Sequence, residues 1–400
     1  MKAVRYLHGL VPLTCGLLAC APLPEPKTGS LDATPTLSAR PWPEADRLFD
    51  PRVHGTAWRG ADVANSIPID HERTLWLFGD TLLSQPGANT CGRFDDFQVQ
   101  VNNSLGMQRG LDPATASMSF FWGESAGKPD AFFAAEGGPD SWLWMGGGTR
   151  VNDSVIVFLM QARTPSEPSA GVGCGGLAFE MIGWQARIAR IGEGDPDTWQ
   201  WHPLRLPETS AWQSILAGSS SVWLDDGFLY AYSGGPSTPT GNPVYLARWS
   251  VADVRRRDLS SPQWYTLDGW RTQAELAGLL PHAVVTNGNA EIYAAPDPLA
   301  DDGWLWVQSE SVIDSPLCYR RGAGPFEFGR CEVFYRPPEL TRYPDSDLLV
   351  YAVKLHPRLS GQDKEVAATY VVNSCQLQDI QQHCELYYPR FLKLYRRADE

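Results

Sequence analysis

A polar turn followed by a short apolar run recurs along this chain. The five copies are "DHERTLWLF" (70–78), "VNDSVIVFL" (151–159), "DDGFLYAY" (225–232), "DDGWLWV" (301–307) and "GQDKEVAATYVV" (361–372). They stand about 60–80 residues apart, and each also has an apolar stretch before the turn. Short apolar runs joined by polar turns predict antiparallel hairpins, and helical periodicity is almost absent.

Repeats of this length, each made of a few antiparallel strands, are typical of a β-propeller. We therefore expect an all-β fold, a five-bladed β-propeller in which residues 49–400 form one domain. A two-sheet sandwich is the alternative. Residues 250–256 and 272–280 are the only short helices that the periodicity supports. In a propeller the first strand of each blade lines a central channel, so we expect functional residues on those strands and at the ends of the second strands.

The first residues of the chain predict a targeting segment. Lys2 and Arg5 precede a short, mostly apolar run over residues 10–19. The sequence Leu17-Leu18-Ala19-Cys20 then resembles the lipobox of bacterial lipoproteins. A plain secretory signal with a small-residue cleavage site is the alternative.

The lipobox implies that residues 1–19 are removed and that Cys20 is acylated. Residues 20–48, which are rich in proline, would then be a tether between the lipid and the propeller. We expect the protein to be exported and lipid-anchored to the cell envelope, at the outer membrane or cell surface, and otherwise secreted. The membrane is thus an expected partner, through this anchor alone, since no later stretch has 18 apolar residues.

Export makes disulfides the expected state of the remaining cysteines. Two of the eight cysteines, Cys15 and Cys20, belong to the signal segment, and the other six are Cys91, Cys174, Cys318, Cys331, Cys375 and Cys384. Cys318–Cys331 and Cys375–Cys384 are close enough in sequence to join local hairpins, which would leave Cys91 with Cys174. The spacing offers no zinc motif, and we expect neither a metal nor a cofactor.

Net charge narrows the classes of partner. The formal net charge is −13 and the isoelectric point is about 5.0, without any basic stripe. Nucleic acid is therefore not an expected partner. The 16 tryptophans suit blade cores, and some of them suit stacking against sugar rings.

Carboxylates in apolar surroundings are the main candidates for chemistry. Asp62 lies on the inner strand of the first repeat, and Asp80 ends the second strand of the same hairpin. Two acids on adjacent strands can face one cleft, as glycoside hydrolysis requires. The alternative is that Asp80 only caps the turn after Gly79 and bonds Thr81.

Further polar residues occupy equivalent places in the repeats and are candidates for substrate binding. They are Glu310, which closes a strand of the fourth repeat; Lys354 and His356, which share a face of the fifth; Asn373, which ends the next strand; and Asn102 and Asn103, which follow Asp80. Lys354 and His356 could also act as bases, so a polysaccharide lyase that acts on a uronate is a further hypothesis.

The first repeat resembles a known bacterial family. "RGADVANSIPI", "TLWLFGDTLL" and "VNNSLGMQ" are similar to the opening of a family of five-bladed propellers long known only as a domain of unknown function. "YAVKLHPRLS", "TYVVNS" and "YYPRFLKL" are similar to its last blade, and "VYLARWSVADV" and "WLWVQSES" to its middle blades. The resemblance covers residues from about 55 to 395.

Some relatives of that family are endo-D-arabinanases, glycoside hydrolases that act on the arabinan of mycobacterial cell walls. The resemblance implies that its two catalytic aspartates are Asp62 and Asp80. This chain departs from the pattern at Gly146–Gly148, where relatives carry an acidic residue.

We therefore expect an endo-arabinanase-like glycoside hydrolase that acts on a cell-envelope or environmental polysaccharide. Asp62 and Asp80 would be the acid pair, and a polysaccharide or oligosaccharide the partner. A non-catalytic carbohydrate-binding surface lipoprotein that uses the same channel mouth is the competing hypothesis.

Overall fold

The computed structural model describes most of the chain beyond the expected tether. The described residues are 36–84, 97–136, 140–165, 179–208, 214–236, 238, 241–288, 291–344, 346–359, 364–383 and 385–397. The expected signal segment and lipidation site, and Cys91, Cys174 and Cys384, lie outside the described residues. No helix in the described part is long and apolar enough to cross a membrane.

The fold is all-β, as predicted, and five sheets contain four or more strands each. The first sheet is β3 (Asn65–Pro68), β4 (Arg73–Phe78), β7 (Ser104–Arg109) and β8 (Ser117–Phe121); the second is β11 (Ser141–Val151), β12 (Ser154–Arg163), β13 (Glu180–Arg190) and β14 (Trp201–Pro203). The third is β15 (Val222–Asp225), β16 (Phe228–Gly234), β17 (Asn242–Ser250), β18 (Gln263–Thr266) and β19 (Gly269–Thr272), with β20 (Ala283–Gly288) beside β17. The fourth is β21 (Tyr293–Pro296), β22 (Trp304–Ser309), β23 (Leu317–Gly322) and β24 (Glu332–Tyr335); the fifth is β25 (Leu348–His356), β26 (Glu365–Ser374), β27 (Arg390–Arg396) and β1 (Leu37–Pro41).

Two smaller sheets extend the first. One is β2 (Trp58–Ala61), β5 (Thr81–Ser84) and β6 (Phe97–Val101), and the other is the hairpin β9 (Gly123–Ser125) and β10 (Lys128–Asp130). Each predicted turn joins the first two strands of a large sheet: β3 to β4, β11 to β12, β15 to β16, β21 to β22 and β25 to β26. The repeat pattern therefore located all five hairpins.

The helices are short and lie between strands. They are α1 (Pro43–Asp46), α2 (Pro51–His54), α3 (Val251–Arg255), α4 (Gln273–Leu276), α5 (Glu339–Arg342) and α6 (Leu377–Gln382), with 3₁₀ turns at Pro196–Thr198 and Pro357–Leu359. The prediction of only two helices was wrong, because one-turn helices are too short for hydrophobic periodicity to detect. The predicted helix 272–280 ends at Leu276, because Ala277 adopts a left-handed conformation with φ of 47°.

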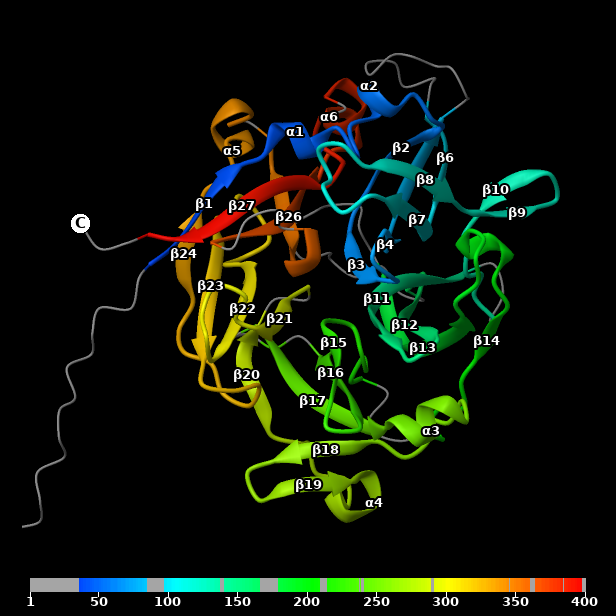
Figure 1. Cartoon of the computed structure of the whole chain (residues 1–400), viewed down its shortest axis with the longest axis vertical. Helices are drawn as coiled ribbons and strands as arrows, with labels where there is room; N and C mark the ends of the chain where they lie inside the picture. Colours follow the sequence, from blue (N-terminus) through cyan, green and yellow to red (C-terminus); the bar gives the residue numbers. More distant parts are fainter. Residues whose placement is uncertain are drawn as a thin grey trace, which may run out of the picture.

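The five large sheets follow one another in chain order around the middle of the molecule (Figure 1). Their first strands meet their neighbours there. Asn65 Nδ2 on β3 donates to the carbonyl of Gly146 on β11 at 2.8 Å. The Gly147 amide of β11 donates to the carbonyl of Gly218, just before β15, at 2.8 Å.

The same contacts continue through the fourth and fifth sheets and return to the first. Ser221 Oγ, directly before β15, accepts the amide of Ala294 on β21 at 2.7 Å. Strands β21 and β22 contact β25. His356 Nδ1 on β25 then lies 2.7 Å from Ser66 Oγ on β3, so each large sheet contacts the next.

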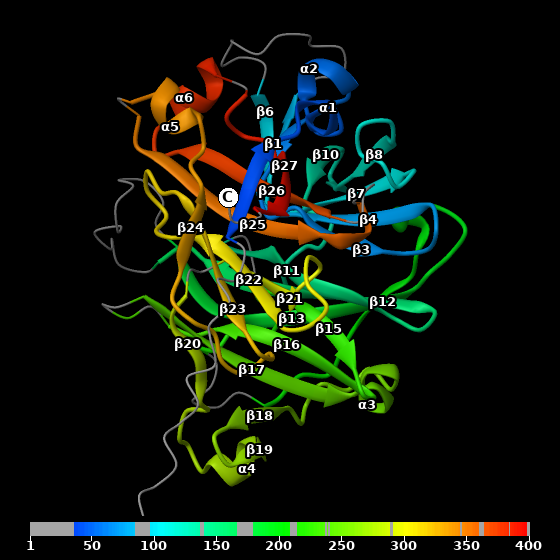
Figure 2. The same ribbon diagram turned by 60° about the vertical axis from the view of Figure 1, so that its left-hand side comes forward.

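The fifth sheet takes its outermost strand from the other end of the chain. β1 pairs antiparallel with β27, from Leu37 opposite Arg396 to Pro41 opposite Leu392. In Figures 1 and 2 the blue strand β1 lies along the red strand β27. The first and last described strands are therefore joined by a backbone ladder.

Strand β4 shows why its sequence is apolar on both faces. Leu75 and Leu77 belong to a buried cluster with the second sheet, whereas Trp76 and Phe78 pack with Phe49 in a separate buried cluster. These four side chains are fully buried. A sheet enclosed between neighbouring elements requires apolar residues at consecutive positions.

The predicted hairpin disulfide Cys318–Cys331 is present and joins β23 to the residue before β24, with 5.5 Å between the Cα atoms. Cys375 is also disulfide-bonded. Its expected partner, Cys384, lies outside the described residues.

Candidate active site

The chain passes three times between the first large sheet and the small sheet of β2, β5 and β6. It does so from β2 to β3, from β4 to β5 and from β6 to β7. The breaks fall at residues 62–64, 79–80 and 102–103. Because β3, β4 and β7 are adjacent and β2, β5 and β6 are also adjacent, the three breaks lie side by side. Asp62, Asp80 and Asn102 are thereby brought together.

The break after β2 has an unusual backbone. Val63 and Ala64 have φ of 67° and 49°, in the left-handed region that a β-branched residue rarely adopts. The Asp62 carbonyl accepts the amides of Ala64 at 2.9 Å and Gly79 at 3.2 Å. A Cβ atom at position 79 would collide with Asp62 Oδ1 and come within 2.9 Å of Val63 Cγ2. Glycine at this position therefore leaves room for the Asp62 carboxyl group.

Asp80 is held by donors from two sheets. Its Oδ1 accepts Trp144 Nε1, from β11, at 2.7 Å and Asn102 Nδ2 at 3.3 Å. Burial raises the pKa of Asp80, and hydrogen bonds from Trp144, Asn102 and Gln100 oppose that rise. The hydroxyl of Thr81 donates instead to the Gly79 carbonyl at 2.8 Å. Asp80 therefore does more than cap its own turn.

Asp62 contacts two tyrosines of the fifth sheet and its connections. Tyr351 donates to Asp62 Oδ2 at 2.9 Å. The hydroxyl of Tyr387 lies 3.4 Å from the same oxygen and 3.0 Å from the carbonyl oxygen of Asp80. Burial, followed by the charges of Asp80 and Glu291, raises the pKa of Asp62 well above its ordinary value, against the tyrosine hydrogen bonds.

Glu291, which sequence analysis missed, is a third carboxyl group in this site. It lies two residues before β21, and its Oε2 is buried without a hydrogen-bond partner among the described residues. Burial raises its pKa, the charge of Lys354 opposes the rise, and the charge of Asp80 adds to it. The one signal in the sequence was an acid directly before the apolar run "IYAAP".

Lys354 is the buried cation of the site. It is 1% exposed, and its Nζ donates to the carbonyl of Ile292 at 3.3 Å. Burial lowers its pKa, whereas the charges of Glu291 and Asp62 raise it.

A β-bulge in β25 aligns Lys354 with Tyr351. Tyr351 pairs with Val371 and Lys354 with Thr369, so one extra residue lies between them on β25. Regular alternation over three positions would direct the two side chains to opposite faces. The bulge gives them the same face, toward the acids.

The other predicted residues are placed differently. His356 is buried, with Nδ1 2.7 Å from Ser66 Oγ and Nε2 2.9 Å from Thr369 Oγ1. Burial, with the charge of Lys354, lowers its pKa to about 3, so this ring is neutral. It lies in the core between β25 and β3 and does not contact the three carboxyl groups.

Asn103, Asn373 and Glu310 also have defined positions. Asn103 is fully buried, and among the described residues its amide bonds backbone groups of Phe133 and Leu143. Asn373 Nδ2 lies 3.1 Å from Tyr351 OH and therefore supports the tyrosine that contacts the first aspartate. Glu310 is exposed at the end of β22, and within the described residues its side chain has no hydrogen bond or ion pair.

Asp62, Asp80 and Glu291, which we call the acid group, cannot all be ionised without strong mutual repulsion. The group therefore retains a proton at pH values where isolated carboxyl groups have lost theirs. All three residues are partly exposed. A retained proton beside an ionised carboxylate is the requirement of general acid–base chemistry.

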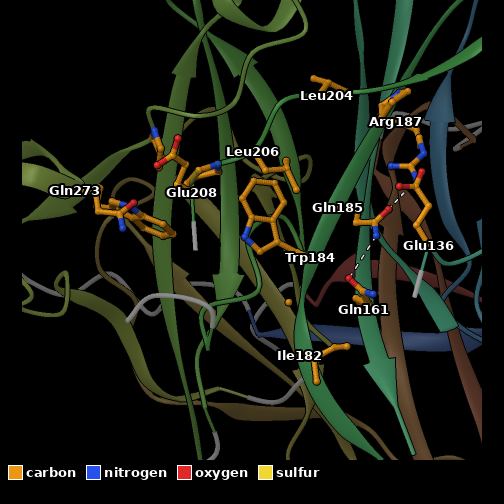
Figure 3. A pocket seen from close by; sticks show the side chains of 15 residues that line it. Glu136, Gln161, Ile182, Trp184, Gln185, Arg187, Leu204, Leu206, Glu208 and Gln273 are labelled. Atoms are coloured by element: carbon orange, nitrogen blue, oxygen red, sulfur yellow. Dashed lines mark hydrogen bonds and ion pairs between the residues drawn. The ribbon is translucent and has the colours of Figure 1, made fainter. Parts of the chain in front are cut away.

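A separate cavity of about 380 Å³ lies along β13 (Figure 3). Trp184 lies on one face of the strand and Gln185 and Arg187 on the other, where Gln161 of the neighbouring strand β12 joins them. Arg187 Nη2 lies 2.7 Å from Gln185 Oε1 and 3.7 Å from Glu136 Oε1, and Gln185 donates to Gln161 at 3.3 Å. These polar groups satisfy one another, so the acid group is the better candidate for chemistry.

The fold and the site define an all-β protein of successive antiparallel sheets, with partly buried carboxyl groups where the inner strands meet. The chain belongs to the family described as a domain of unknown function, DUF5005, whose model matches residues 46–396. No curated protein matches it in sequence.

Solved structures show a related fold. A protein of Bacteroides ovatus ATCC 8483 described as a "putative hydrolase" is 15% identical, with a TM-score of 0.63, and the match covers 92% of this chain and 93% of that one. A family 117 glycoside hydrolase of Zobellia galactanivorans has a TM-score of 0.47 at 8% identity, covering 90% of each chain. A xylan β-1,4-xylosidase of Bacillus halodurans C-125 has a TM-score of 0.45 at 10% identity, covering 84% of this chain and 53% of its own. The last two likenesses are too distant to support an argument.

Proposed function

We propose that this protein is a glycoside hydrolase built on a five-bladed β-propeller, with its active site at the acid group. The five large sheets would be the blades. The contacts that pass from each first strand to the next, and from β25 back to β3, support a closed ring. The pairing of β1 with β27 would complete the last blade.

The observation that carries the proposal is the juxtaposition of three partly buried carboxyl groups in different environments. Glycoside hydrolysis needs one carboxyl group that keeps its proton and one that has lost it. Asp62 has its pKa raised by burial and by two neighbouring acids. Asp80 accepts N–H donors from Trp144 and Asn102, which favour its ionised form.

In the proposed mechanism Asp62 is the general acid, which protonates the leaving oxygen of the glycosidic bond. Asp80 is the base or nucleophile on the other side of that bond. Glu291 and Lys354 together set the electrostatic field: the negative charge of Glu291 favours the protonated form of Asp62, and Lys354 limits that effect.

The proposed substrate is a polysaccharide of the cell envelope or the environment, with arabinan as the first to examine. A lipid anchor at Cys20 would hold the enzyme at the envelope. A uronate lyase is less well supported. His356, one of its candidate bases, is buried and hydrogen-bonded through both ring nitrogens.

The test is release of reducing ends from a panel of polysaccharides that includes arabinans and galactans. The wild-type protein would be compared with Asp62→Asn, Asp80→Asn and Glu291→Gln, and with Asp301→Asn at an exposed site as the control. We expect the first two substitutions to reduce the rate at least about 100-fold and the control to leave it unchanged. Circular dichroism would verify that every variant is folded.

Two results would contradict the proposal. Equal rates for wild type and Asp62→Asn would remove the acid group from the mechanism. Binding of a glycan without turnover by the wild type would instead indicate a carbohydrate-binding protein on the same fold.

A further inference from the structure

Three aromatic side chains lie next to Asp80 and in contact with one another through Trp144. Trp144, whose indole N–H donates to Asp80 at 2.7 Å, has its ring centre 4.8 Å from that of Phe179 and 5.6 Å from that of Trp142. Trp142 and Trp144 share one face of β11 because they are two positions apart, and Phe179 directly precedes β13. We call these three residues the aromatic row.

The outer end of the row is open to solvent. Phe179 is 46% exposed and is the one aromatic residue among the exposed large hydrophobic side chains of the described residues. Trp142 and Trp144 are partly exposed. The buried Nε1 of Trp142 has no hydrogen-bond partner within the part of the chain that the structure describes. Phe179 therefore offers an exposed apolar face, and the ring of Trp144 beside it is partly exposed.

We propose that the aromatic row is a binding subsite for a neutral sugar ring next to the bond that is cleaved, with Phe179 as the exposed stacking surface. This inference rests on the function proposed above and names the substrate class of that site. The C–H face of a sugar ring packs on an aromatic face, and its hydroxyl groups take hydrogen bonds at the rim. Because Trp144 donates to Asp80, a sugar ring bound on the aromatic row would lie next to the acid group.

The charges of the site favour a neutral sugar over an acidic one. Three carboxyl groups face the site, and among the described residues the cation near them is Lys354, which is buried beside Glu291. His356 is neutral because burial lowers its pKa to about 3. A uronate or another anionic ring would therefore meet net negative charge, because the charge of Lys354 is already balanced by Glu291.

The experiment measures affinity separately from turnover. Asp62→Asn, which we expect to bind without cleaving, is the parent, and Phe179→Ala, Phe179→Leu and Phe179→Trp are added to it. Leu267→Ala, at a position 75% exposed between β18 and β19, is the matched control. Arabinan and galactan oligosaccharides are the neutral probes, and oligogalacturonate is the anionic probe, in titration calorimetry.

We expect Phe179→Ala and Phe179→Leu to weaken binding of the neutral probe roughly tenfold, and Phe179→Trp and Leu267→Ala to leave it near the parent value. Oligogalacturonate should bind at least about tenfold more weakly than the neutral probe. An unchanged affinity in Phe179→Ala, a leucine as good as phenylalanine, or tight binding of oligogalacturonate would each overturn the inference.

The two proposals fail in different ways. Cleavage by the wild-type protein, together with unchanged affinity in the Phe179 variants, would reject the aromatic row alone. Absence of both cleavage by the wild type and binding by the parent, for every probe, would reject the row together with the hydrolase.

Discussion

Val63 and Ala64 hold left-handed backbone conformations beside Asp62, and each costs of order 1–3 kcal/mol in isolation. The surrounding structure stabilises them, since the Asp62 carbonyl accepts two amides and the Asp62 carboxyl group is bonded by Tyr351. Gly79 leaves the space into which that carboxyl group fits. At the residue scale, the position of the acid therefore depends on small groups around it as much as on the acid itself.

Gly79→Ala tests this dependence. The added methyl group collides with Asp62 Oδ1, so we expect polysaccharide cleavage to fall about 100-fold because the carboxyl group is displaced. Gly324→Ala is the control, since a Cβ there meets nothing within 4 Å and the backbone is not left-handed. Rates and melting temperatures should be measured together. A Gly79→Ala protein with normal activity would show that Asp62 does not need its present position.

The raised pKa of Asp46 predicts that the stability of the protein depends on pH. Burial raises its pKa to about 6, although Asp46 Oδ1 accepts the Phe391 amide at 2.6 Å. The folded state therefore holds this proton more tightly than the unfolded chain, whose aspartates titrate near pH 3.9. The stability associated with the protonated form is complete below about pH 4 and is lost as the pH rises through about 6.

Asp46→Asn removes the charge and keeps an oxygen acceptor for Phe391. We expect it to stabilise the protein by about 1–2 kcal/mol at pH 8 and by almost nothing at pH 4. Urea unfolding at both pH values, with Asp301→Asn as the exposed control, measures the difference. A gain of the same size at both pH values would contradict the assignment.

At the scale of elements, strand β11 joins the second sheet to the first. Its Gly146 carbonyl accepts Asn65 of β3, and two positions earlier Trp144 reaches Asp80. Register shifts occur in β11 between Met145 and Gly148 and in β25 between Tyr351 and Lys354. Such bulges redirect side chains where regular strands would alternate. Both irregular strands contribute residues to the site.

Trp144→Phe keeps a ring in place and removes the N–H that bonds Asp80. Because that hydrogen bond lowers the pKa of Asp80, its loss should raise the pKa further. The acidic limb of the rate profile should then move to higher pH, and the maximal rate should fall about tenfold. Trp270→Phe, on β19 of the third sheet, is the control, since its ring packs with Tyr230 and Tyr265 and not with Asp80. Identical pH profiles for the two variants would remove Trp144 from this role.

At the scale of the whole molecule, β1 and β27 join the two ends of the described chain. Leu37 of β1 is 2% exposed and packs in the cluster of the fourth and fifth sheets. Without β1, the ladder of β27 would have an open edge. The stability of the fifth sheet therefore depends on residues more than 300 positions away in sequence.

Truncation measures that dependence. A chain that begins at residue 36 keeps β1, and a chain that begins at residue 43 lacks it. We expect the second to be less stable by on the order of 3 kcal/mol, through lost burial and ladder hydrogen bonds. Thermal unfolding of the two proteins gives the comparison. Equal melting temperatures would show that β1 is dispensable for the last sheet.

Much of the fold was predictable because turns and strand alternation depend on residues that are neighbours in sequence. The polar turns marked all five inner hairpins, and the spacing of Cys318 and Cys331 identified their disulfide. The one-turn helices were missed because their periodicity is too short to detect. Asp62 and Asp80 lie near each other in sequence, on connected strands, so their proximity could also be inferred.

The rest of the site depends on contacts between sheets. Glu291, which precedes the fourth sheet, lies near Asp62 and Asp80. Lys354 faces these acids because of a β-bulge that the local sequence did not predict. His356 shares the strand of Lys354, yet it bonds Ser66 and Thr369 in the core.

The sequence by itself determined the all-β class, the five hairpins and the neighbouring pair of aspartates, because turn chemistry and strand periodicity are local. Only the tertiary structure decided which buried charges meet, since burial and the charges of distant neighbours set the pKa of each carboxyl group.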